Sequence, residues 1–302
     1  MRVSYSAAPS PLQAVVSDRP AKATVVDRSI GDIIRSMRKL SDAQIEEIIT
    51  YQKAHGIRFG EAAVALSLVD DNDVLWALSQ QFHYPYAPEG REPENPELVV
   101  AADPFGQQAE IFRDLCSQVT MTAPEPGRPR RAYCVVSPDS GDGKSFMAAN
   151  LAVAFSQIGG RTILVDADMR SPRQHQIFGI EGASGLSSIL AGRAETDVVH
   201  SVANLPSMFV MPVGTVPPNP MELLQRPAFN MLMQELLNKF DHVIVDTPAL
   251  SRGADTRVIA GRCGAAIAVG RKGRTNMAAM GQLISGMAAA RTQVVGLVMN
   301  EY

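Results

Sequence analysis

The sequence predicts an α/β fold with a mostly parallel, doubly wound sheet, preceded by a small all-α module. Short apolar strands alternate with helical segments between residues 133 and 299, which is typical of such a sheet. A Gly-rich loop joins the first of these strands to a helix, as in phosphate-binding folds. Nearer the amino terminus a helix–turn–helix pattern occurs twice, which indicates a separate helical unit.

The composition excludes several classes of protein. The chain has 302 residues, enough for two domains, and its net charge of −3 gives no general attraction to nucleic acid or an anionic membrane. The three cysteines, Cys116, Cys134 and Cys263, form no Cys-x-x-Cys pair, which argues against a disulfide framework or a zinc site. No apolar run approaches a membrane span and no signal-peptide core is present, so we expect a cytoplasmic protein.

A helical repeat module is expected over residues 27–87. The pattern at residues 29–45 recurs at residues 58–74. In each copy a short helix and a turn precede a longer helix, which Ser41 or Asp70 would cap. Two such hairpins can pack together as a four-helix module.

Three other segments complete the predicted domain organisation. Residues 1–26 are rich in Ser, Ala, Pro and Val without periodicity, and we expect a disordered arm there. Residues 88–102 belong to a Pro- and Glu-rich stretch at residues 83–103 and are expected to be a linker. Residues 103–302 form the predicted α/β domain, whose first helix is expected to run from Asp103 to Thr122.

The segment from Tyr133 to Gln157 has the order of a P-loop: apolar strand, Gly-rich loop, helix. In the Gly-x-Gly-Lys-Ser core, glycines let backbone N–H groups turn toward a phosphate, Lys144 reaches the β- and γ-phosphates, and Ser145 is a ligand of Mg²⁺. Pro138 replaces the usual first glycine, so an ordinary Gly-rich turn is the alternative. The residues expected to hold the nucleotide here are Ser140, Gly141, Asp142, Gly143, Lys144, Ser145 and Phe146.

Three acidic residues follow strands next to this loop. The strand at residues 162–165 leads into Asp166 and Asp168, which would point the same way because they lie two apart in an extended segment. The strand at residues 242–245 leads into Asp246, as in a Walker B strand. Such carboxylates can hold Mg²⁺, directly or through water, or accept a proton. The alternative for the first pair is a polar loop in which an Asp caps a helix.

The rest of the chain supplies the remaining elements. Strands are expected at residues 208–211, 265–269 and 294–299, and helices at 227–239, from Asp255 and after a Thr275 cap. Helical spacing predicts core positions in the last helix at Met277, Met280, Ile284 and Met287. The basic run at residues 271–274 is expected to be a solvated loop rather than a contact with a phosphate or a partner.

Five motifs then occur in a characteristic order. They are the Gly-Lys-Ser loop with Asn150-Leu151-Ala152, a Walker A′ box at residues 163–170, Pro-Pro-Asn-Pro at 217–220, a Walker B box at 241–248, and Val-Gly-Leu-Val-Met-Asn at 295–300. Residues 103–300 thereby resemble the cytoplasmic domain of the bacterial tyrosine kinases that accompany exopolysaccharide chain-length determinants. With the helical module, the chain is most similar to EpsG-type chain-length determinant protein tyrosine kinases.

This resemblance implies a P-loop NTPase fold, a MgATP-dependent protein-tyrosine kinase and a transmembrane polysaccharide co-polymerase as partner, through which the chain would lie at the inner membrane. It also implies that Asp166 accepts the tyrosine proton, that Asp168 binds the metal or its water, and that Asp246 belongs to the metal shell. Asn300 would contact adenine. A nearby base is useful because the pKa of tyrosine is about 10.

Three features depart from the resemblance. The chain shows Tyr302 in place of the usual terminal tyrosine cluster, which leaves the phosphorylation target open. The family's ring-forming motif keeps Glu110 and Arg113, but Cys116 replaces its second Arg, so a homo-oligomer is also left open. The helical module resembles the amino-terminal domain of type II secretion ATPases, some of which bind cyclic di-GMP. In the repeat motif of that domain, Ser29 replaces the arginine, and Arg38 and Ser67 replace two glycines. These replacements favour a docking module over a nucleotide-binding one.

Two alternatives to a kinase remain. One is a non-kinase switch whose ATP state regulates polysaccharide export through binding. The other is a ParA- or MinD-like partitioning ATPase acting on DNA or membrane. Those proteins carry an additional lysine where this chain has Asp139, and no basic surface signal or terminal amphipathic helix is present, so we expect no nucleic-acid partner.

Overall fold

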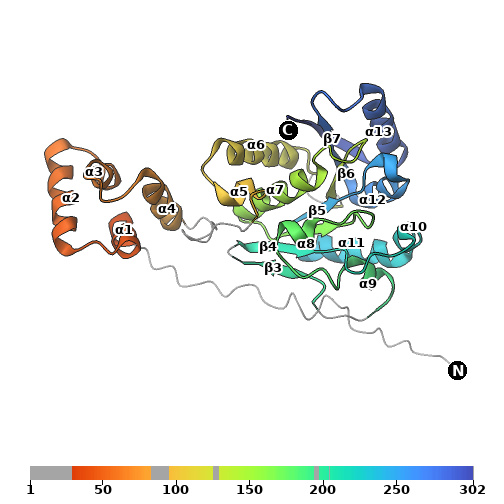
Figure 1. Ribbon diagram of the computed structural model, residues 1–302, viewed down its shortest axis with the longest axis horizontal. Coiled ribbons are helices and arrows are strands. Elements are labelled where there is room, and N and C mark those ends of the chain that lie inside the picture. Colours follow the sequence, from red (N-terminus) through yellow and green to blue (C-terminus); the bar gives the residue numbers. More distant parts are fainter. Residues whose placement is uncertain (1–28, 83–94, 125–128, 194–196, 204, 302) are drawn as a thin grey trace. The chain divides into compact units, whose positions relative to one another are not determined.

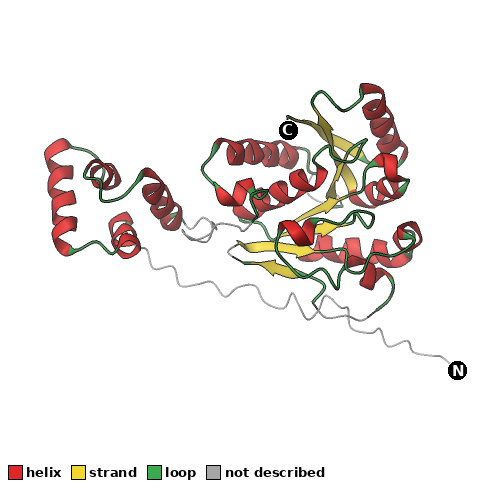
Figure 2. Cartoon of the chain, viewed as in Figure 1, coloured by secondary structure: helices red, strands yellow, loops and turns green. Residues whose placement is uncertain are grey.

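The computed structural model describes residues 29–82, 95–124, 129–193, 197–203 and 205–301 (Figures 1 and 2). They fall into two compact units, one within residues 29–82 and one from residue 95 onward. The arm expected at residues 1–26 and the linker at residues 88–94 lie outside the described residues. None of the described helices has both the length and the apolar character needed to cross a bilayer.

The first unit consists of the four predicted helices. Ser41 caps the second helix and Asp70 caps the fourth, each through a capping box. In it the side chain of the cap residue accepts a hydrogen bond from the backbone N–H of the N3 residue, and the N3 side chain accepts one from the backbone N–H of the cap residue. The core contains fully buried Ile34, Ile48 and Ala77. The helices are α1 (Ile30–Arg38), α2 (Asp42–His55), α3 (Phe59–Ala65) and α4 (Asp71–Gln81).

Two turns in this unit adopt the left-handed conformation that favours glycine. Ser67 has a φ of 57°, as the expected glycine at this position would have. In the first repeat the left-handed residue is Lys39, with a φ of 52°, one position after Arg38. The Arg38 guanidinium instead pairs with the buried carboxylate of Asp73 at 2.6 Å, which joins α1 to the start of α4.

The second unit is built on a seven-stranded sheet in the order β3-β4-β2-β5-β1-β6-β7. All neighbouring strands are parallel except the edge pair β3 and β4, which confirms the predicted fold class. The short antiparallel strand β3 was not expected. The strands are β1 (Ala132–Val136), β2 (Thr162–Asp166), β3 (His200–Val202), β4 (Leu205–Met211), β5 (His242–Asp246), β6 (Gly264–Arg271) and β7 (Gln293–Asn300).

Helices cover both faces of this sheet, so its central strands are buried on both sides. Alternate residues of β2 enter different cores: Ile163 and Val165 pack with α9 to α13, whereas Leu164 packs with α5 to α7. The helices are α5 (Val99–Ala102), α6 (Gln107–Met121), α7 (Lys144–Gln157), α8 (Gln174–Ile177), α9 (Leu186–Leu190), α10 (Pro220–Leu224), α11 (Pro227–Lys239), α12 (Asp255–Cys263) and α13 (Met277–Ala289), with a 3₁₀ turn at Leu250–Arg252.

The end of the predicted linker is part of this second unit. Leu98 and Val100 are buried in the core, and the Asn150 amide of α7 accepts a hydrogen bond from the Val100 N–H at 3.1 Å. The linker expectation was wrong for residues 95–102, because a short apolar run here packs against α7. The following helix begins at Gln107 rather than Asp103, since residues 103–106 form a turn.

The last helix also differs from expectation. Asn276 caps α13, because its side chain accepts a hydrogen bond from the backbone N–H of Ala278. Met280 and Met287 are buried as predicted. Met277 and Ile284 are exposed, and Leu283 takes the core position between the two buried methionines. The helix presents a narrower buried stripe than the sequence spacing indicated.

Candidate nucleotide site

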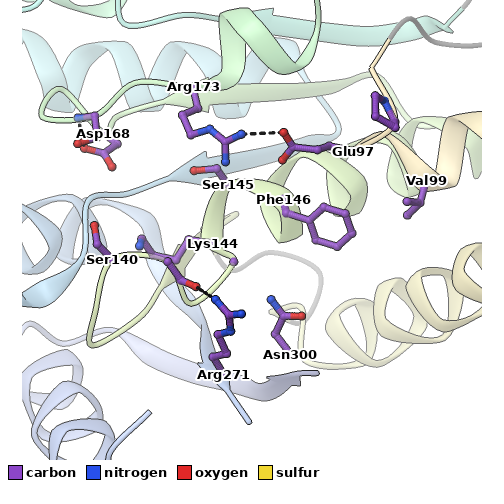
Figure 3. A pocket seen from close by; sticks show the side chains of 14 residues that line it. Glu97, Val99, Ser140, Lys144, Ser145, Phe146, Asp168, Arg173, Arg271 and Asn300 are labelled. Atoms are coloured by element: carbon purple, nitrogen blue, oxygen red, sulfur yellow. Dashed lines mark hydrogen bonds and ion pairs between the residues drawn. The ribbon is translucent and has the colours of Figure 1, made fainter. Parts of the chain in front are cut away.

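A cavity of about 460 Å³ lies at the P-loop, a size typical of small-molecule sites (Figure 3). It gathers residues from five separate parts of the chain: the segment that leads into α5, the P-loop, the turn after β2, the end of β6 and the end of β7. Its lining comprises Pro96, Glu97, Val99, Ser140, Gly141, Gly143, Lys144, Ser145, Phe146, Asp168, Ser171, Arg173, Arg271 and Asn300.

The P-loop has the backbone form that phosphate binding requires. Gly141 and Gly143 have φ angles of 85° and 98°, which other residues rarely adopt. A Cβ on Gly143 would lie 2.1 Å from Asn300 Nδ2. Lys144 is buried, and its Nζ lies 3.5 Å from the carbonyl oxygen of Asp139, so its ammonium group is held across the loop. The P-loop residues therefore line a preformed space, of the kind in which backbone N–H groups bind a phosphate.

Asp142 supports the loop from behind and does not line the cavity. Its carboxylate is fully buried, accepting hydrogen bonds from the backbone N–H of Asp139 at 2.9 Å and from the Thr275 hydroxyl at 3.0 Å. Asn300 Nδ2 donates to the Asp142 carbonyl oxygen at 3.1 Å. Asp142 and Asn300 thus shape the loop, and Asn300 also faces the cavity.

The basic run expected to be solvated contacts the P-loop. Arg271 Nη1 donates to the Gly141 carbonyl oxygen at 3.3 Å, and Arg274 Nη2 donates to the Ser140 carbonyl oxygen at 3.4 Å. Arg271 also lines the cavity. Residues 272–274 of this run are exposed, as expected, and the two hydrogen bonds to P-loop carbonyl oxygens are a contact that the sequence did not indicate.

The carboxylates of Asp166 and Asp168 lie in different surroundings. Asp166 is fully buried, and its oxygens accept hydrogen bonds from the backbone N–H groups of Asp168, Arg173 and Gln174 at 3.0–3.1 Å. Burial and the charge of Asp246 raise its pKa well above the ordinary value. Asp168 lines the cavity instead. The strand ends at Asp166, so the side-chain alternation assumed for the pair does not extend to Asp168.

Asp246 lies beside Asp166, since the two residues are paired in register between β5 and β2. It is fully buried, and its Oδ2 accepts a hydrogen bond from Gln174 Nε2 at 2.8 Å. Among the described residues Oδ1 has no hydrogen-bond partner. Burial raises the pKa of Asp246 to about 6, although hydrogen bonds from Ser145 and Gln174 oppose the rise.

These surroundings fit Mg²⁺ bound together with phosphates. The unpartnered Oδ1 of Asp246 leaves a buried acceptor that a metal-bound water can satisfy. Ser145 and Asp168 line the adjoining cavity. No group of three His, Cys, Asp or Glu side chains in the described residues is arranged to hold a metal. Mg²⁺ usually binds through one or two carboxylates plus substrate phosphates, so such a group is not required.

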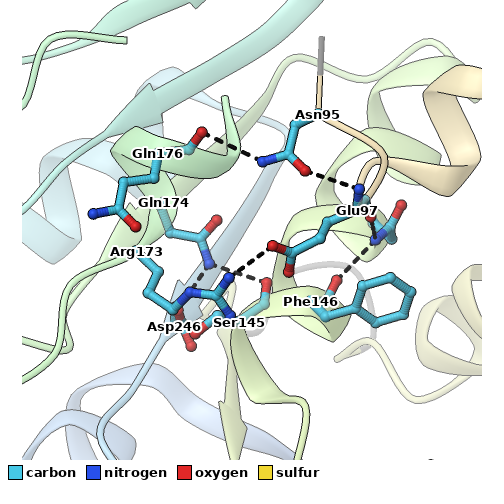
Figure 4. A network of polar contacts seen from close by, with 9 residues as sticks. Asn95, Glu97, Ser145, Phe146, Arg173, Gln174, Gln176 and Asp246 are labelled. Carbon is cyan, nitrogen blue, oxygen red and sulfur yellow. Dashed lines mark hydrogen bonds and ion pairs between the residues drawn. The ribbon is translucent and has the colours of Figure 1, made fainter. Parts of the chain in front are cut away.

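Three polar residues of the site, Glu97, Arg173 and Gln174, were not predicted from the sequence, and they belong to one network of polar contacts (Figure 4). Gln174 Nε2 donates to the carbonyl oxygen of Ser145 at 3.1 Å as well as to Asp246, joining the P-loop helix to the Walker B strand. Arg173 and Glu97 form an ion pair at 2.7 Å on the cavity wall. No sequence pattern marks these residues, because their partners are remote in the chain.

Comparisons with known proteins agree with this geometry. The model of a family described as the CobQ/CobB/MinD/ParA nucleotide binding domain matches residues 133–302. The tyrosine-protein kinase CpsD of Streptococcus agalactiae is 32% identical over 176 residues, covering 58% of this chain and 76% of that protein. The crystal structure of the chimerical protein CapA2B2 aligns with a TM-score of 0.64 and 31% identity, covering 74% of this chain and 97% of that one. The kinase domain of the Escherichia coli tyrosine kinase ETK aligns with a TM-score of 0.64 and 26% identity, covering 68% of this chain and 80% of that one.

Proposed function

Since this chain belongs to the bacterial tyrosine kinases of the CobQ/CobB/MinD/ParA nucleotide-binding family, we propose that it is an ATP-dependent protein-tyrosine kinase of exopolysaccharide biosynthesis. It would regulate polymerisation, export and chain length. The observation that carries the proposal is the cavity in which Lys144, Ser145 and Asp168 meet beside buried Asp246. Phosphoryl transfer depends mainly on positioning and charge stabilisation, which such a site supplies.

The nucleotide would lie along the P-loop. Backbone N–H groups of residues 140–146 and the Lys144 ammonium group would bind its phosphates, and Asn300 at the end of β7 would face its base. Ser145, Asp168 and Asp246 are the residues that would hold Mg²⁺. When bound, this ion neutralises phosphate charge and orients the transferred group.

Asp166 would accept the proton of the attacking tyrosine. Its raised pKa suits a base for this hydroxyl. Asp168 lines the cavity, whereas Asp166 is fully buried behind it. The family resemblance assigns the base to Asp166 and the contact with the metal or its water to Asp168. Replacing each by Asn separately tests this division.

The described tyrosines restrict where this chain could phosphorylate itself. Tyr133 is buried in β1 and unavailable in the folded protein. Tyr51 is half-buried and stacks on His55 with ring centroids 4.0 Å apart. Tyr51, the tyrosines outside the described residues and a partner protein are therefore the acceptors that mapping should distinguish.

Incubation with labelled MgATP followed by phosphotyrosine mapping tests the proposal. We expect phosphotyrosine on the chain or on its partner, and its loss in Lys144→Met and in Asp166→Asn. Lys272→Met is the matched control, because this exposed lysine pairs with Glu301 outside the cavity. ATP turnover with no phosphotyrosine under any condition would instead support the nucleotide-dependent switch.

We further propose that a transmembrane polysaccharide co-polymerase is the partner and holds the chain at the inner membrane. The family is the support for this assignment, so the assay should be run with and without the partner's cytoplasmic segment. A homo-oligomer is a separate proposal, which rests on the family resemblance. Glu110 and Arg113 pair with each other at 2.6 Å, and Cys116, at the position of the motif's second Arg, is fully buried.

A further inference from the structure

Two arginines line the cavity at different places (Figure 3). Arg271 lies near Asn300, toward the expected base of the nucleotide. Arg173 lies near Ser145, toward the expected phosphates and metal. The Arg173 guanidinium is paired with Glu97, Nη2 to Oε1 at 2.7 Å. The proposed function gives no role to this pair.

The backbone of Arg173 is fixed to the site. Its N–H donates to Asp166 Oδ2 at 3.1 Å, and the next residue, Gln174, is fully buried with hydrogen bonds to Asp166 and Asp246. Its side chain is freer, with 48% of its surface exposed. Arg173 can therefore change its side-chain partner while its backbone remains anchored beside the two buried carboxylates.

Glu97 is held from two sides (Figure 4). Its N–H donates to Asn95 Oδ1 at 2.9 Å, and its carbonyl oxygen accepts a hydrogen bond from Asn150 Nδ2 at 2.7 Å. Asn150 also donates to the Phe146 carbonyl oxygen at 3.0 Å, within the helix that follows the P-loop. The Glu97 backbone is therefore fixed against the phosphate-binding helix, and its carboxylate reaches Arg173 from there.

We propose that Arg173 binds the terminal phosphates of ATP and that Glu97 holds this guanidinium in the nucleotide-free enzyme. This inference rests on the proposed function, which supplies ATP as the ligand. Both partners are partly exposed, so their ion pair is weak and a phosphate can displace it. The planar guanidinium also binds phosphate oxygens through two N–H groups at once. Phosphate binding by Arg173 would thus release Glu97.

Calorimetric titration of the full chain with MgATP and with AMP tests this. Arg173→Gln should bind MgATP at least about tenfold more weakly, because a charged hydrogen-bond donor to phosphate is lost. Its affinity for AMP should stay within about twofold, since AMP lacks the terminal phosphates, and this also shows that the variant folds. Arg291→Gln, an exposed arginine just before β7, is the matched control.

Glu97→Gln should bind MgATP about two- to fivefold more tightly, because a weak competing ion pair is removed. In the double variant with Arg173→Gln, this gain should vanish. A gain that persists there would show that Glu97 acts by repelling phosphate directly, which overturns the pairing. Equal losses for MgATP and AMP in Arg173→Gln would overturn the phosphate contact.

The titration does not measure phosphotyrosine. A chain that shows these affinity differences but never phosphorylates tyrosine would refute the proposed function and leave this inference standing. A chain that phosphorylates tyrosine but binds MgATP equally well with and without the Arg173 side chain would support the proposed function and refute this inference.

Discussion

Replacing Asp246 by Asn tests the electrostatics of the site. Asp246 is fully buried at the end of β5, and burial raises its pKa from an ordinary 3.8 to about 6. The neighbouring Asp166 has a raised pKa through burial and through the charge of Asp246. The substitution Asp246→Asn keeps the shape of the side chain and removes its titration.

The direction of the pKa shift fixes the sign of the effect on stability. Well below its unfolded pKa of 3.8 this carboxyl is protonated in the folded and in the unfolded chain, so burial carries no cost of ionisation. As the pH rises from 3.8 to about 6, the unfolded chain ionises while the folded carboxyl stays protonated, so the folded protein loses stability, and above about 6 the loss is complete. A rise from 3.8 to about 6 corresponds to about 3 kcal/mol. Between about pH 2.5 and pH 7.5, the free energy of unfolding of Asp246→Asn minus that of the wild type should increase by about this amount.

Urea unfolding of the nucleotide-free chain, followed by circular dichroism at several pH values, measures the difference. The helical unit and the titrating groups away from the site are the same in both proteins, so they cancel. The pKa of Asp166 falls in the variant, because the charge of Asp246 is gone, so the measured difference should be at least this large. The same variant should bind MgATP more weakly, because the proposed metal-shell carboxylate is gone. If the stability difference stays constant with pH, the Asp246 carboxyl is solvated in solution and the reasoning fails.

Two other substitutions test the P-loop and the helical unit. Gly143→Ala should weaken MgATP binding about tenfold or more, because its Cβ would lie 2.1 Å from Asn300 Nδ2 at a φ of 98°. Unchanged affinity in a calorimetric titration would contradict the loop geometry. Arg38→Ala should destabilise the helical unit by about 2 kcal/mol, because the buried carboxylate of Asp73 loses its guanidinium partner. Trp76 is the chain's single tryptophan, so fluorescence during urea unfolding follows this unit, and an unchanged midpoint would refute the estimate.

Local patterns predicted the fold class well. The helix at 227–239 has the bounds that its Pro start and apolar spacing indicated, and Ser41 and Asp70 cap the helices that they were expected to cap. These features depend on neighbours within four residues, which the sequence displays directly. The prediction for residues 95–102 was wrong, because only their packing against α7 distinguishes that segment from a linker.

The sequence by itself determined the chemistry that the site can contain. It placed Lys144 and Ser145 after the Gly-rich loop and put acids at the ends of two strands, because a P-loop and the alternation of strands and helices are local properties of the chain.

Only the tertiary structure decided how those groups are presented. It buries Asp166 and Asp246 side by side, leaves Asp168 on the cavity wall, and brings Glu97 to Arg173 across 76 residues of chain. Burial and pairing between distant segments follow from how the sheet and its covering helices pack. No local pattern encodes that packing, and it sets the pKa values and the ion pair on which the predictions above depend.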